Sequence, residues 1–260
     1  MTAKLLSIFN DKKETTDHSN IKLSDSPLKD NISDFTIVKG NRAYEAYKTT
    51  PHLRSIAALY PELLTFVVKK DSTITSLSDK DIKIGYVGQD TKYLLDYIYE
   101  KLDLNASNLI EIDQNQTTQM LKNNSIDGYI GLFVHPSTIL KDQSSKIDIR
   151  FINFRQKVYN QLIRSNSFLL KAKIKKDSYH IQNHDVITLG VKTLLLTSKD
   201  CDDEIVYKLT KSLLDNMDKL KNLNPIYKNI SKKDLLEELV IPQHNGAIKA
   251  FNNMKEDDNL

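Results

Sequence analysis

The sequence predicts an α/β fold in two lobes. Segments with the apolar pattern of strands alternate with helical segments between residues 75 and 185, which indicates βαβ units around a largely parallel sheet. Two long apolar runs, Leu53–Val68 and Val186–Thr197, flank this block and are long enough to pass between two lobes. The 260 residues, 40% of them apolar, can form two packed cores. We therefore expect residues 1–74 and 186–260 to form the first lobe and residues 75–185 the second.

The first lobe is expected to begin with a loop. Residues 10–31 are polar and precede a short apolar strand, Asp34–Val38. The turn Lys39–Asn41 then opens a helix over residues 42–48. Pro61 interrupts the apolar run that follows, so we expect the chain to reverse its direction there.

The second lobe is expected to alternate strands and helices throughout. The predicted elements are, in order, the strand 83–87, the helix 91–102, the strand 109–112, the helix 117–124, the strand 127–132, a helix from Ser137 and the strand 147–152. Ligands of such sheets bind at the carboxyl ends of the strands. The strand-to-helix turns at 39–41, 85–91 and 131–136 are therefore the candidate binding segments.

Two helices are expected in the rest of the chain. Residues 156–164 have a helical pattern, and residues 202–220 predict one amphipathic helix docked on the surface. The apolar face of this second helix is formed by Ile205, Leu209, Leu213, Met217 and Leu220.

The composition argues against several kinds of binding partner. The formal net charge is only +3, and the chain has 32 lysines against 5 arginines, whereas nucleic-acid recognition depends strongly on arginine. We therefore expect no nucleic-acid partner. Cys201 is the one cysteine of the sequence, so an internal disulfide and a thiolate zinc site are excluded.

No apolar run approaches the roughly 18 residues that a membrane-spanning helix needs. The first 20 residues contain too short an apolar stretch for a secretory signal. The chain as written is therefore expected to remain in the cytoplasm.

Catalytic and metal-binding motifs are not found. The sequence contains no GxSxG, P-loop or GxGxxG pattern. His180 and His184 are four residues apart, but they lack the glutamate of an HExxH motif. We therefore expect no enzymatic activity, no metal and no cofactor.

Several segments together resemble one family, the TAXI subgroup of substrate-binding proteins of TRAP transporters. The best match is Leu53–Glu62 (LRSIAALYPE), which resembles the strand that enters the hinge of these proteins. Residues 85–91 (GYVGQDT) align with a GPPGSGT turn, and Ile241–Ala247 (IPQHNGA) resembles the C-terminal IPLHPGA. The resemblance spans about residues 32 to 251. It implies a type II periplasmic binding protein-like fold and a periplasmic location.

The chain also departs from this family. Members begin with a strand and a TGGTGG-like turn, whereas no glycine precedes Gly40 here. The resemblance therefore implies that the first lobe is incomplete at its N-terminal side. The Gln-Ser-Asp that follows the family's next strand is replaced by Lys39-Gly40-Asn41.

The resemblance implies seven ligand-binding residues. In the second lobe, Gly88 permits a tight turn, and Thr91 begins a helix whose free N–H groups favour a carboxylate. Asp90 opposes an anion at the same helix end. His135 follows a strand and has either a structural role or a role as hydrogen-bond donor or cation for the ligand, and Tyr179 is a candidate lid residue.

The other three candidates belong to the first lobe. Lys39 and Asn41 lie at the turn after the first predicted strand, and Tyr44 lies at the start of the helix that follows. Lys39 is suited to pair with a carboxylate, although solvated or packing roles remain open for all three residues.

The expected function is that of a non-enzymatic receptor. By the resemblance, it binds a small carboxylate such as glutamate or 2-oxoglutarate and delivers it as a monomer to a TRAP membrane permease. The alternative is a degenerate, N-terminally truncated family member that binds nothing.

Overall fold

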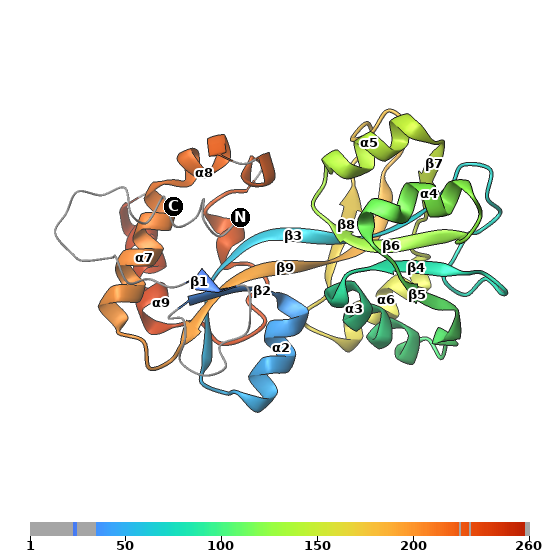
Figure 1. Ribbon diagram of the computed structural model, residues 1–260. Helices are drawn as coiled ribbons and strands as arrows, with labels where there is room; N and C mark the ends of the chain where they lie inside the picture. Colours follow the sequence, from blue (N-terminus) through green and yellow to red (C-terminus); the bar gives the residue numbers. More distant parts are fainter. Residues whose placement is uncertain (1–22, 25–34, 224, 229, 258–260) are drawn as a thin grey trace. The chain divides into compact units, whose positions relative to one another are not determined.

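The computed structural model describes residues 23–24, 35–223, 225–228 and 230–257 (Figure 1). These residues form a mixed α/β fold that divides into two compact units. Unit 1 contains the chain up to Tyr60 and from Lys192 onward, and unit 2 contains Pro61–Val191. The predicted division into two α/β lobes is therefore confirmed.

Two long strands carry the chain between the units. β3 (Leu53–Lys69) has 17 residues and β9 (Val186–Ser198) has 13. The unit boundary falls inside both of them. The prediction that these two apolar runs connect the lobes is thus confirmed.

The predicted reversal at Pro61 is wrong. β3 continues through Pro61 without interruption, because the fixed φ of proline is compatible with an extended backbone. The lobe boundaries also differ from the predicted ones, because each connecting strand contributes residues to both units. They were expected at residues 74 and 186, whereas the structure divides the chain within the strands, after Tyr60 and after Val191.

Unit 1 is built around β2, which pairs with strands on both sides. The short β1 pairs with it in parallel, Leu23 opposite Phe35, and β9 pairs antiparallel, Lys39 opposite Thr193. Leu23 and Ser24 therefore form a strand where a loop was expected, and the rest of residues 10–31 lies outside the described residues, apart from these two. The elements of unit 1 besides β3 and β9 are β1 (Leu23–Ser24), β2 (Phe35–Lys39), α2 (Gly40–Thr49), α7 (Asp203–Asp215), α8 (Met217–Leu223), η3 (Pro225–Tyr227), η4 (Lys233–Leu236) and α9 (Asn245–Asp257).

The amphipathic segment of unit 1 forms two helices instead of one. α7 ends at Asp215, Asn216 caps it, and α8 begins at Met217. Leu209, Leu213, Met217 and Leu220 are buried as predicted, whereas Ile205 is 47% exposed and its neighbour Val206 is buried in its place. Asp202 caps the start of α7 by accepting hydrogen bonds from two backbone N–H groups of the first turn.

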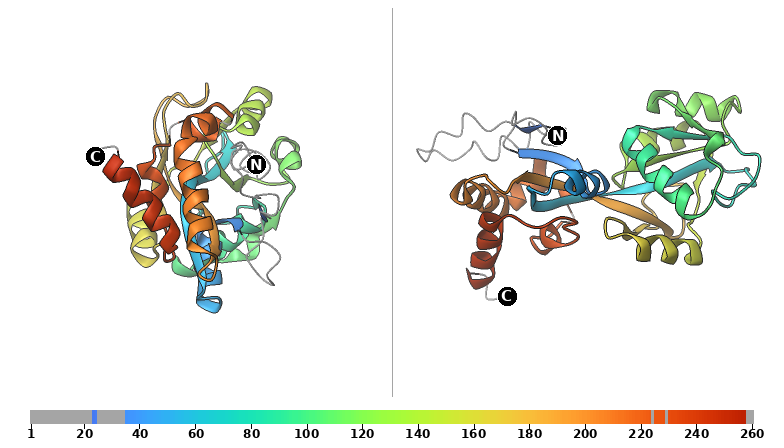
Figure 2. Two further views of the ribbon diagram at one scale, coloured as in Figure 1. Left: turned by 90° about the vertical axis from the view of Figure 1, so that its left-hand side faces the viewer. Right: turned by 90° about the horizontal axis from the view of Figure 1, so that it is seen from below.

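The C-terminal motif joins α9 to α7, which pack side by side in Figure 2. The ring of His244 is buried, and its Nδ1 accepts from the Gly246 N–H at 3.2 Å while its Nε2 donates to the Cys201 carbonyl at 3.1 Å. A Cβ atom on Gly246 would lie 2.2 Å from the Asp203 carbonyl oxygen, so only glycine permits this close approach.

Unit 2 contains the predicted alternation of strands and helices, with one further strand, β8. Its elements besides β3 and β9 are β4 (Ile84–Val87), α3 (Gln89–Lys101), η1 (Ala106–Asn108), β5 (Leu109–Glu111), η2 (Gln114–Gln116), α4 (Thr117–Lys122), β6 (Gly128–Phe133), α5 (Thr138–Lys146), β7 (Ile149–Phe151), α6 (Gln156–Ser165) and β8 (Leu170–Ile174).

The sheet of unit 2 has a parallel centre. β4 pairs in parallel with β5 and β6, while β3 pairs antiparallel with β6 and β7. The strand order and right-handed crossovers place α3 on one face and α4 and α5 on the other, as in Figure 1. The carboxyl ends of β4 and β6 therefore lie together, with Val87 opposite Gly131.

Candidate functional site

In unit 1 the predicted binding turn is the start of α2. α2 begins directly after β2, and Lys39 at its N-cap position has an extended backbone and makes no side-chain cap. A Cβ on Gly40 would lie 3.2 Å from the Lys192 carbonyl oxygen, so glycine allows β9 to approach this turn closely.

Asn41 is the most unusual residue of this turn. Its side chain is completely buried, and neither the Oδ1 nor the Nδ2 atom has a hydrogen-bond partner among the residues that the structure describes. Burying an amide without a hydrogen bond costs about 1–3 kcal/mol. Asn41 therefore carries a donor and an acceptor that no described residue satisfies, and a ligand reaches them only if the neighbouring side chains move.

Two other side chains, Tyr44 and Lys192, belong to segments at this turn. Tyr44 is half-buried, and the Nζ atom of Lys48 lies 4.9 Å from the centre of its ring. Lys192, which sequence reasoning missed, is 8% exposed and pairs with Glu238 at 3.4 Å. No spacing pattern marks Lys192, because it sits inside an otherwise apolar strand.

In unit 2 the start of α3 has the predicted glycine turn. Gly88 lies at the N-cap position with φ of 80°, and no atom lies within 4 Å of where its Cβ would stand. Thr91 is buried, and its Oγ1 accepts from the Leu132 N–H at 3.3 Å. This bond ties the start of α3 to the end of β6 and leaves the hydroxyl hydrogen able to donate.

His135 and Tyr179, which lie 44 residues apart in the chain, are hydrogen-bonded to each other. The Tyr179 oxygen accepts from the Ser137 N–H at 2.7 Å and donates to His135 Nδ1 at 2.8 Å. His135 Nε2 then donates to Thr65 Oγ1 at 2.8 Å, and Thr65 donates to the Leu63 carbonyl at 3.0 Å. Every donor in this chain of bonds has an acceptor, which fixes the tautomer of the imidazole.

The protonation states agree with these bonds. Burial lowers the pKa of His135 to about 4 and raises the pKa of Tyr179 to about 12, although the Ser137 N–H partly offsets the latter shift. Both groups are therefore neutral at pH 7, and His135 does not provide a cation. A ligand could reach either ring nitrogen only by replacing an existing hydrogen bond.

The structure thus distributes the seven predicted residues over three places. Lys39, Asn41 and Tyr44 lie at α2, Gly88 and Thr91 lie at the start of α3, and His135 is paired with Tyr179. Thr65 and Ser137, which complete the His135 network, carry no sequence signal because their contacts are long-range.

The described part of the chain contains neither a cluster of metal-ligating side chains nor a membrane-spanning helix. Within residues 23–24, 35–223, 225–228 and 230–257, no three His, Cys, Asp or Glu side chains come together as a metal site would require. In the same residues, no helix has the length and apolar character needed to cross a membrane.

Comparison with known proteins gives a family match. The model of the NMT1-like family matches residues 30–254. Among curated proteins, the chain is similar to UvrABC system protein C of Borrelia garinii subsp. bavariensis, with 30% identity over 158 residues. That match covers 56% of this chain and 25% of the other protein, so the chain spans about a quarter of its length.

Solved structures give weaker likenesses. A protein of Bordetella bronchiseptica RB50 has a TM-score of 0.47 and 13% identity, over 85% of this chain and 73% of that one. The periplasmic sulfonate-binding protein SsuA of Methylobacillus flagellatus KT has a TM-score of 0.45 and 17% identity, over 80% and 56% of the two chains. TM-scores below 0.5 at such identities say nothing about the ligand or partner of this chain.

Proposed function

The chain belongs to the NMT1-like family, which is of the periplasmic binding-protein type, and we propose that it is the solute-binding receptor of a transport system. More specifically, we propose a TAXI-type receptor that binds a small carboxylate such as glutamate or 2-oxoglutarate. In this proposal the chain acts as a monomer in the periplasm, carries out no reaction and delivers its ligand to a TRAP membrane permease.

The observation that supports this proposal most directly is the unpartnered amide of Asn41. A ligand carboxylate at the start of α2 would accept from Nδ2, and a ligand ammonium or hydroxyl group would donate to Oδ1. Lys39 would add positive charge at the same helix end, where the helix dipole already favours an anion. The enclosed position of Asn41 would strengthen each of these bonds.

The start of α3 offers a second carboxylate site in unit 2. Gly88 leaves open space beside the first turn of the helix, and the Thr91 hydroxyl can donate to a ligand oxygen. Asp90 lies in the same turn and weakens the preference for an anion. A role in ligand binding for His135 and Tyr179 would require their present bonds to rearrange.

The competing proposal is a family member that has lost ligand binding. It is supported by Asp90 at the start of α3 and by the fully satisfied bonds of His135. A chain of this kind would fold but would leave the amide of Asn41 without any partner.

Isothermal titration with glutamate and 2-oxoglutarate, carried to millimolar concentration, separates the two proposals. For a receptor, Asn41→Ala removes a charge-assisted hydrogen bond worth about 1.5–3 kcal/mol, so binding weakens by roughly tenfold or more. Asn252→Ala on the exposed face of α9 is the matched control and leaves binding unchanged. Absence of heat with both ligands supports the degenerate form, and equal binding by both variants contradicts the assignment of Asn41.

A further inference from the structure

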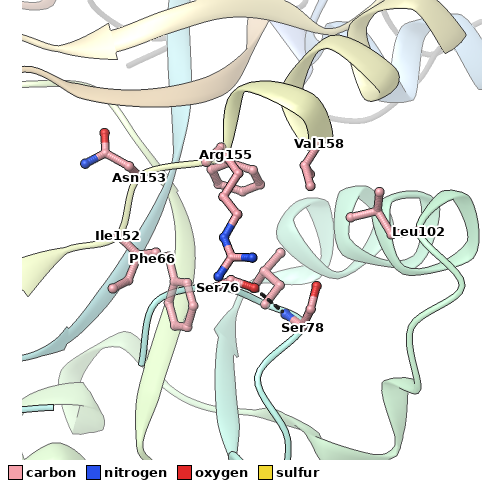
Figure 3. A pocket seen from close by; sticks show the side chains of 10 residues that line it. Phe66, Ser76, Ser78, Leu102, Ile152, Asn153, Arg155 and Val158 are labelled. Carbon is pink, nitrogen blue, oxygen red and sulfur yellow. Dashed lines mark hydrogen bonds between the residues drawn. The ribbon is translucent and has the colours of Figure 1, made fainter. Parts of the chain in front are cut away.

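One pocket of unit 2 combines an apolar wall with a basic one (Figure 3). Its enclosed part has a volume of about 50 Å³. It adjoins a wider hollow of about 320 Å³, with which it shares Ile152, Asn153 and Arg155. The apolar wall is formed by Phe66, Leu77, Leu102, Ile152, Phe154 and Val158.

Arg155 is the basic residue of the narrow pocket, and Arg150 lines the adjoining hollow with it; they are two of the five arginines of the chain. Figure 3 shows the Arg155 side chain extending from the start of α6 toward Ser76, between Val158 and Phe66. One terminal nitrogen of Arg155 donates to Thr75 Oγ1 at 3.3 Å, and one of Arg150 donates to the carbonyls of Ser72 and Ile74.

Neither arginine has a carboxylate partner in the described part of the chain, although many lysines do. Two acids contact segments beside the pocket, and neither forms an ion pair with an arginine. Asp79 accepts from the Thr75 and Ser76 N–H groups, and Asp185 pairs with Lys173 at 2.6 Å. Asp79 is linked to Arg155 only through the Thr75 hydroxyl, so the remaining guanidinium N–H groups give this pocket donors and positive charge that no direct ion pair neutralises.

The pocket is distinct from the predicted ligand turn of the same unit. Leu102 follows the C-terminal end of α3, whereas Gly88 precedes its N-terminal end. The 13 residues of α3 span about 20 Å at 1.5 Å per residue. A ligand in this pocket would therefore not touch Gly88 or Thr91.

We propose that this pocket binds a small organic anion with a carboxylate head and a short aliphatic tail. The head lies in the wider hollow and accepts from the Arg155 guanidinium, while the tail packs against Phe66, Leu77 and Val158. Inorganic phosphate would leave the apolar wall uncovered, and an aliphatic amine would meet the charge of both arginines. The small enclosed volume restricts the tail to a few carbon atoms. This inference is independent of the proposed receptor function.

The test is a titration of the ¹⁵N-labelled chain with hexanoate, followed by amide shifts, with hexylamine and inorganic phosphate as comparison ligands. We expect saturable shifts for hexanoate at residues 75–78, 102 and 150–158, and none of comparable affinity for the other two ligands. Arg155→Gln weakens hexanoate binding at least tenfold. Arg164→Gln, at the other end of α6, is the matched control and changes it less than twofold.

A second variant tests whether the anion needs an Arg155 guanidinium that is not ion-paired. Val158→Glu places a carboxylate three residues after Arg155 on the same helix, where it can pair with the guanidinium and exclude the anion. Binding is then lost while the helical circular dichroism is kept. The proposal is overturned if the wild-type chain shows no saturable hexanoate shifts up to 20 mM, on the order of the weakest affinities of interest. It is equally overturned if Arg155→Gln and Arg164→Gln bind alike.

Discussion

Replacing Asn41 by leucine should make the protein more stable. Leucine has the same number and branching of side-chain heavy atoms as asparagine, although its methyl groups are bulkier and require some repacking, while two buried polar atoms without partners are removed. An unsatisfied buried amide costs about 1–3 kcal/mol, and this cost disappears in Asn41→Leu. For a chain of this size each kcal/mol corresponds to about 2–4 °C in Tm. We expect the free energy of unfolding to rise by at least about 1 kcal/mol and any glutamate-induced rise in Tm to vanish.

The assay is urea unfolding followed by circular dichroism, with and without glutamate. Asn252→Leu on the exposed face of α9 is the control, because it makes the same change of helix propensity without removing a buried group. The reasoning is refuted if Asn41→Leu lowers the free energy of unfolding by more than 1 kcal/mol relative to this control, on the order of one lost hydrogen bond. Such a loss would mean that the amide already has partners in the protein.

Three further predictions concern unit 2. Tyr179→Phe leaves the Ser137 N–H and His135 Nδ1 unpaired, so it should lower the free energy of unfolding in urea by about 1–3 kcal/mol. The control Tyr159→Phe removes a buried hydroxyl that has no partner and should leave this free energy unchanged. The pKa of His135 falls from 6.5 in the unfolded chain to about 4 in the folded one. The neutral imidazole therefore contributes its full share of the folding free energy above pH 6.5, and about 3 kcal/mol of it, at 1.36 kcal/mol per unit, is lost as the pH falls toward 4. If the stability of His135→Gln falls as steeply as that of the wild type between these pH values, the prediction is wrong. Gly88→Ala meets no steric clash but forces alanine to a φ of 80°, and should lower stability by about 1–2 kcal/mol; an unchanged Tm would show that the turn relaxes.

The local pattern of the sequence predicted most of the fold. The alternation of apolar strands and amphipathic helices fixed the elements of unit 2, because each element obeys its own period of two or 3.6 residues. The apolar run at Leu53–Val68 identified one connecting strand. The local pattern predicted the structure wrongly at two places. At Pro61 the tertiary structure holds the chain extended, and at Asn216 a single helical pattern covers two helices.

The sites were less predictable because their contacts join distant segments. His135 and Tyr179 were both selected as ligand-binding residues, but the structure pairs them with each other and adds Thr65, which lies 70 residues before His135. No local pattern shows that a histidine will find both its partners inside the protein. Arg155 was not predicted as a binding residue, because an arginine before a helix has no distinctive spacing in the sequence.

The difference between His135 and Asn41 separates stability from binding in this chain. Both are polar groups removed from water, and both were predicted to meet the ligand. Both ring nitrogens of His135 are hydrogen-bonded within the protein, so these bonds stabilise unit 2, and a ligand would have to break one of them to bind the ring. Asn41 is the one buried amide of the described residues for which neither polar atom has a partner. The protein therefore bears the free-energy cost of removing this amide from water without forming a hydrogen bond to it. A ligand that supplies the missing hydrogen bonds would not have to replace existing ones. The ligand of the proposed receptor should therefore be sought first at the start of α2.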